Sequence, residues 1–76
     1  DMIVKCIFPE HLIQDPIIYQ LGYEFDVTTS IRQAKVTSDA GWVVLDILGE
    51  ELEIQKSIVW LAEKGIGIQI VKEEIV

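Results

Sequence analysis

The chain has 76 residues, of which half are hydrophobic, and a formal net charge of −7. This length predicts one domain over 1–76, and so small a domain has a thin margin of stability. The single cysteine, Cys6, excludes an internal disulfide, and the single histidine, His11, excludes a Cys/His metal cluster. We therefore expect an unusually apolar core, self-association, and no metal or other cofactor.

Charge and hydropathy narrow the classes of partner. The six Lys and Arg residues are scattered along an acidic chain, whereas a phosphate backbone requires clustered cations. The longest apolar runs, such as 42–45, are far shorter than the roughly 20 residues of a membrane span. No leader with a charged and then an apolar segment opens the chain. We expect a cytoplasmic protein that neither binds nucleic acid nor inserts into a membrane.

The first third of the chain predicts a strand and a helix. Residues 2–8 are rich in apolar and β-branched types, which favours a mostly buried strand that ends at Pro9. Residues 10–14 form an irregular lead-in, because Pro16 is unfavourable inside a helix. Asp15 and Pro16 are a typical N-cap and first-turn pair, so the helix is predicted to begin there. Its apolar face holds Ile17, Ile18, Leu21 and Phe25.

The middle of the chain predicts an antiparallel hairpin. Residues 27–37 form a polar strand whose alternation changes phase, and a bulge near Arg32 or Gln33 would reconcile its two halves. Residues 38–41 are rich in turn-forming types, and 42–48 form the third strand.

The last third predicts a second helix and a fourth strand. Gly49 precedes the helix and Gly65 follows it, and its buried stripe is Ile54, Ile58, Leu61 and Ala62. Ile66, Ile68 and Ile70 alternate along the final strand. The order βαββαβ is that of the ferredoxin-like α+β fold, a four-stranded antiparallel sheet with two helices on one face. Strands one and three lie at the centre of this topology.

The helices of this fold leave one face of the sheet uncovered. If Val4 and Val43 point toward the helices, the uncovered face carries a contiguous apolar patch of Ile3, Ile7, Trp42, Val44 and Leu48, together with Lys5 and Asp46. Such a patch usually marks an interface, which predicts a homodimer. The alternative is that long side chains such as Lys5 shield the patch in a monomer.

Catalytic constellations are largely absent from the sequence. His11 lies in an irregular segment with Glu10 as its only close acidic neighbour. Cys6 falls on the helix side of a central strand, where cysteine behaves as a small buried hydrophobe. The acids around Glu51 suit a helix N-terminus electrostatically. We expect no enzymatic activity.

Four blocks of sequence resemble the NIL domain, and they lie at 2–18, 25–36, 41–50 and 58–66. They include Ser30-Ile31-Arg32-Gln33-Ala34-Lys35-Val36 and Gly41-Trp42-Val43-Val44-Leu45. The resemblance implies an ACT-related regulatory domain that dimerises. Members at the C-terminus of methionine importer ATPases bind methionine and inhibit transport, whereas others are fused to iron–sulfur ferredoxin modules or stand alone. The quoted blocks resemble the latter branch, although this chain has no cluster-ligating cysteines.

Two functional hypotheses follow. In the first, the domain is a dimeric regulatory module that senses methionine or a related sulfur amino acid, with Ile31, Arg32 and Gln33 at the bulge as the ligand-binding residues. Arg32 is the best anchor for a carboxylate, through bidentate hydrogen bonds. In the second, the domain is a protein–protein interaction module that accompanies a ferredoxin or transporter subunit and has no ligand of its own.

Overall fold

A computed structural model describes residues 1–73 of the chain. Its elements, in chain order, are β1 (Met2–Phe8), a 3-10 helix (Glu10–Leu12), α1 (Ile17–Glu24), β2 (Val27–Val36), β3 (Gly41–Gly49), α2 (Glu51–Glu63) and β4 (Gly67–Glu73). Apart from the short 3-10 helix, this is the predicted βαββαβ order. Within residues 1–73, neither helix is long and apolar enough to cross a membrane.

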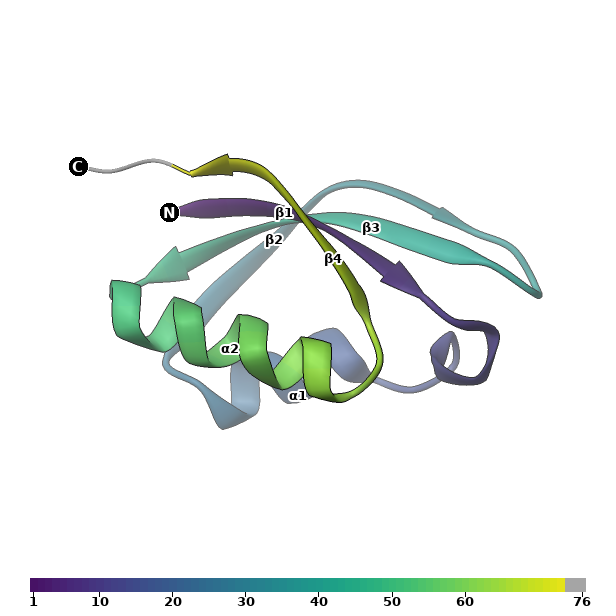
Figure 1. Cartoon of the computed structure of the whole chain (residues 1–76), viewed down its shortest axis with the longest axis horizontal. Coiled ribbons are helices and arrows are strands. Elements are labelled where there is room, and N and C mark those ends of the chain that lie inside the picture. Colours follow the sequence, from purple (N-terminus) through teal and green to yellow (C-terminus); the bar gives the residue numbers. More distant parts are fainter. Residues whose placement is uncertain (74–76) are drawn as a thin grey trace.

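The four strands form one antiparallel sheet in the order β2-β3-β1-β4. β1 and β3 therefore lie at the centre, and β2 and β4 are the edges. Both helices pack beneath the same face of the sheet, as Figure 1 shows. The ferredoxin-like α+β fold predicted from the sequence is confirmed.

The hydrophobic core lies between this face and the helices. Side chains at alternate positions of the two central strands are buried there, and they meet the inward faces of α1 and α2. They are Val4 and Cys6 of β1, Val43, Leu45 and Ile47 of β3, Ile17 and Leu21 of α1, and Ile54 and Leu61 of α2. Complete burial of a Val, Leu or Ile side chain contributes about 1.5–3 kcal/mol, so this layer dominates the folding free energy.

The start of α1 differs from the prediction. Pro16, and not Asp15, is the N-cap residue, and no side chain caps the helix. The carbonyl oxygen of Pro16 accepts the first helical hydrogen bond, from the N–H of Gln20 at 3.0 Å, which places Asp15 one residue too early to cap. The predicted irregular lead-in contains a 3-10 turn that buries Leu12.

The buried stripe of α2 also differs in one position. Ile54 and Leu61 are buried as predicted and Ile58 is half-buried, but Ala62 is exposed and Ser57 is fully buried. Ser57 tolerates burial because its hydroxyl donates a hydrogen bond to the carbonyl oxygen of Ile54 at 2.7 Å. The polar type of Ser57 concealed an inward position that the helical spacing allows.

The pairing of the strands contains two irregularities. The β2–β3 register shifts between Ile31 and Gln33, which leaves Arg32 as the extra residue and confirms the predicted bulge. A second shift, in the pairing of β1 with β4, lies between Ile3 and Val4 and was not predicted. The first irregularity matters for function, because a bulge redirects the side chain at which it occurs.

Candidate functional site

The face of the sheet that points away from the helices carries the five residues predicted to form an interface. Ile3, Trp42, Val44 and Leu48 are half-buried and Ile7 is exposed. The antiparallel register places Ile7 opposite Trp42 and Lys5 opposite Val44. The predicted apolar patch is therefore contiguous across β1 and β3, and we refer to this surface as the open face.

A lysine partly shields the open face. The Lys5 ammonium group lies 4.5 Å from the centroid of the Trp42 ring. A cation over an aromatic face is attracted by the ring quadrupole, and the aliphatic stem of the lysine covers apolar surface. This contact covers Trp42 but leaves Ile7 exposed, at 41% of its surface.

An ion pair lies on the open face at the β2 bulge. Ser30 is opposite Asp46 and Gln33 is opposite Val44, so the extra residue between them, Arg32, is adjacent to β3. The Nη2 atom of Arg32 donates a hydrogen bond to Oδ2 of Asp46 at 2.6 Å. The bulge thus directs a guanidinium group over the central strand from the edge of the sheet.

The two partners differ sharply in exposure. The Arg32 side chain is 58% exposed, whereas that of Asp46 is 10% exposed. The second carboxylate oxygen of Asp46, Oδ1, is buried and accepts no hydrogen bond from the residues that the structure describes. A buried polar atom without a partner costs about 1–3 kcal/mol, more when it is charged. The guanidinium of Arg32 is therefore accessible from solvent, and the carboxylate of Asp46 retains one acceptor oxygen without a donor.

The predicted ligand-binding residues do not share one face. Arg32 and Gln33 are exposed and lie next to open-face residues of β3, but Ile31 pairs with the core residue Leu45 and lies on the helix side of β2, where it is 59% exposed. The side chain that contacts Arg32 on the open face is that of Asp46, which was not among the predicted ligand-binding residues. The sequence signal for Asp46 was a single acid within the otherwise apolar strand 42–48.

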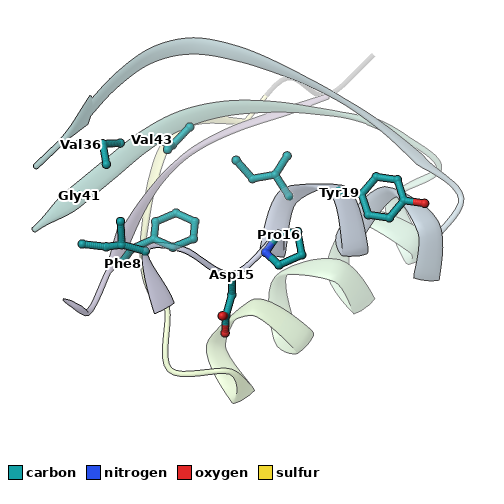
Figure 2. A pocket seen from close by; sticks show the side chains of 9 residues that line it. Phe8, Asp15, Pro16, Tyr19, Val36, Gly41 and Val43 are labelled. Atoms are coloured by element: carbon teal, nitrogen blue, oxygen red, sulfur yellow. The ribbon is translucent and has the colours of Figure 1, made fainter. Parts of the chain in front are cut away.

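A second concave region lies on the helix side, between the start of α1 and the β2–β3 hairpin (Figure 2). This apolar cleft has a volume of about 290 Å³. Its walls are mainly apolar and include Phe8, Ile13, Pro16, Ile18, Val36 and Val43. Figure 2 shows the carboxylate of Asp15 directed away from the strands. The cleft can accommodate an apolar group, and Asp15, the charged residue in its lining, does not direct its carboxylate toward the strands.

Within residues 1–73, the two candidate catalytic residues, Cys6 and His11, lie in different surroundings. Cys6 is buried, and burial raises the pKa of its thiol to about 11. His11 is exposed and, with Glu10 and Thr37, lines an open depression in the surface. Within residues 1–73, no three His, Cys, Asp or Glu side chains are placed to hold a metal ion.

Comparisons with known proteins agree with this architecture. The sequence model of the NIL domain matches residues 2–70. Among solved structures, the chain is similar to the C-terminal domain of an ABC transporter ATP-binding protein from Enterococcus faecalis, with 27% sequence identity and a TM-score of 0.81. That match covers 96% of this chain and 86% of the other. No curated protein matches the chain.

Proposed function

The chain belongs to the NIL domain family, and from this premise we propose that it is a cytoplasmic regulatory domain without catalytic activity that binds a small amino acid as a homodimer. One structure to which it is similar is the C-terminal domain of an ABC transporter ATP-binding protein. A domain in that position is suited to altering the activity of a neighbouring unit. Methionine or a related sulfur amino acid is the ligand that we propose.

The observation that carries this proposal is the exposed guanidinium of Arg32 at the bulge. Among the described residues, the guanidinium donates one hydrogen bond, from Nη2 to Asp46. The other four of its five N–H donors are therefore available to a ligand. A guanidinium binds a carboxylate through two parallel hydrogen bonds. Val44, the open-face neighbour of Gln33, offers apolar surface for the ligand side chain. A thioether is polarizable and packs well on such a surface.

The open face also links ligand binding to dimerisation. Among the side chains described, this face carries the cations Lys5, Arg32 and Lys35 but only one acid, Asp46. Two copies that cover each other's apolar patch therefore bring like charges together, which opposes association. A zwitterionic amino acid adds no net charge, but its apolar side chain beside Val44 extends the apolar patch that two copies would bury, which favours association. We propose that the ligand promotes the dimer in this way.

Thermal unfolding with L-methionine tests the proposal. A ligand that binds only the native state raises the free energy of unfolding by about 2.7 kcal/mol at one hundred times its dissociation constant. We expect the melting temperature of the wild type to rise with methionine, and the rise to be lost in Arg32→Met. Lys35→Met is the matched control, because it removes a cation from the same strand and face and should retain the rise. No rise at millimolar concentrations of methionine or related amino acids would contradict the proposal.

The second candidate is an interaction domain that accompanies a ferredoxin or transporter subunit and binds no ligand. The exposed part of the open-face patch, with Ile7 at 41%, favours it. The two candidates are distinguished by their ligand response: an interaction domain associates with its partner, while no amino acid changes its melting temperature.

A further inference from the structure

One oxygen of a buried carboxylate on the open face has no hydrogen-bond donor. Asp46 lies in the central strand β3 and is only 7% exposed, and its Oδ1 accepts no hydrogen bond from the described residues. Among the described side chains, every other buried nitrogen or oxygen has a hydrogen-bond partner. Native proteins rarely leave a buried polar atom unpaired. Each exception needs an explanation, such as backbone strain, a functional role, or a water or ion that binds there.

The neighbouring groups identify the kind of donor that is missing. Oδ2 of the same carboxylate accepts a hydrogen bond from Arg32 at 2.6 Å, and Arg32 is the group that we propose for a ligand carboxylate. A donor for Oδ1 would therefore lie close to that carboxylate. In an α-amino acid, the ammonium and carboxylate groups are attached to one carbon atom. We infer that Asp46 binds the α-ammonium group of the ligand whose carboxylate binds Arg32, an inference that rests on the proposed function.

Oδ1 is shielded in the free chain, so binding requires one side chain to move. Arg32 is on an edge strand, at a bulge, with its side chain 58% exposed, whereas Asp46 is fixed in the centre of the sheet. Arg32 is therefore the mobile partner. We expect that, when it turns its free N–H groups toward the ligand carboxylate, the ligand ammonium group approaches the Asp46 carboxylate, whose Oδ2 Arg32 occupies in the free chain. One internal ion pair is exchanged for two ion pairs with the ligand.

This arrangement selects for the charge pattern of the ligand. The Arg32–Asp46 pair has no net charge, so it is complementary to a zwitterion. A simple carboxylic acid leaves Oδ1 without a donor, and an amine without a carboxylate leaves Arg32 without a partner. Because Asp46 is shielded from water, each of these omissions costs more than it would at an exposed site.

Isothermal titration with three ligands separates these contributions. The ligands are L-methionine, 4-(methylthio)butanoate, which lacks the ammonium group, and L-methioninamide, which lacks the carboxylate. For the wild type we expect L-methionine to bind at least about tenfold more tightly than either analogue, since each loses a hydrogen bond to a charged group. In Asp46→Asn, which keeps an acceptor for Arg32, we expect the preference over 4-(methylthio)butanoate to fall to about one. Ser30→Ala is the matched control, a change of a polar residue opposite Asp46 that should retain the preference.

The outcomes distinguish the inference from the proposal beneath it. If Asp46 serves only to hold Arg32 in place, Asp46→Asn weakens both carboxylate ligands equally and the tenfold preference persists, which would overturn the inference and leave methionine binding intact. If the wild type binds neither carboxylate ligand, the proposed function fails as well. Should Asp46→Asn not fold, the wild-type comparison decides, because equal affinities for L-methionine and 4-(methylthio)butanoate would exclude an ammonium contact.

Discussion

The carboxylate of Glu53 accepts a hydrogen bond from the backbone N–H of Asp26 at 3.0 Å. The contact joins the first turn of α2 to the loop between α1 and β2, two segments that are far apart in the sequence. The other oxygen of Glu53 lies 3.2 Å from the ammonium of Lys56. Both contacts favour the ionised carboxylate, so they lower the pKa of Glu53 below its ordinary value of 4.5, the hydrogen bond from Asp26 being the larger cause.

We expect Glu53→Gln to destabilise the fold at neutral pH. Since the folded-state pKa of Glu53 is depressed, its contribution to stability is fully present above the unfolded-state pKa and is lost as the pH falls through the folded-state pKa. Urea denaturation at pH 7 should give a lower midpoint for the variant, and the difference should shrink as the pH falls below about 4. Glu51→Gln is the control, in the same helical turn. A difference independent of pH would contradict the role of the charge.

The native chain should resist thiol reagents. Burial raises the pKa of Cys6 to about 11, so at pH 8 the reactive thiolate is on the order of one molecule in a thousand. We expect 5,5′-dithiobis(2-nitrobenzoate) to label the folded protein very slowly, and to label it rapidly in concentrated urea. Native labelling as fast as that of a free cysteine would show that the core around β1 opens readily.

Gly49 should be intolerant of a side chain. A Cβ atom there would lie 2.9 Å from the carbonyl oxygen of Asp26, closer than such a contact allows, and a tight 3.2 Å from Cγ1 of Val27. We expect Gly49→Ala to lower the free energy of unfolding by about 1–3 kcal/mol. Gly41→Ala is the control, because its Cβ would meet its neighbours at an ordinary 3.7 Å. Equal urea midpoints for the two variants would contradict the close packing at Gly49.

Val44→Lys should abolish self-association. Val44 is at the centre of the open face, opposite Lys5, and a second ammonium there adds both charge repulsion and a desolvation cost to any contact. In saturating L-methionine, sedimentation equilibrium should show a dimer for the wild type and a monomer for the variant. Val36→Lys is the control on the helix side of the same hairpin, where Val36 is already 61% exposed, and it should remain dimeric. A monomeric wild type would contradict an interface on the open face.

Local patterns were enough to predict most of the fold. Alternation placed Val4 and Val43 on the helix side, and the change of phase between Ile31 and Ala34 predicted the bulge that the register confirms. Both follow from the period of two in a strand, which a single sequence displays. The helical spacing of α2 was less decisive: the prediction misplaced Ala62 and missed Ser57, because the spacing allowed both positions and residue type favoured the alanine.

The candidate site was only partly predictable. The bulge indicated Arg32 and Gln33, but which side chain meets Arg32 depends on the register of β2 against β3, and the bulge itself sets that register. Asp46 could be assigned to the open face and not to a partner. The apolar cleft depends on how the start of α1 sits against the β2–β3 hairpin. The position of α1 relative to the hairpin cannot be predicted from any local sequence pattern.

The most direct measurement is a map of amide chemical-shift changes in the ¹⁵N-labelled chain on addition of L-methionine. Binding at the Arg32–Asp46 pair should shift the amides of residues 30–33 on β2 and 44–47 on β3 most strongly, in proportion to the fraction bound. Saturable changes that instead centre on the apolar cleft, around Val36 and Phe8, or the absence of any change at millimolar methionine, would contradict an amino-acid site on the open face.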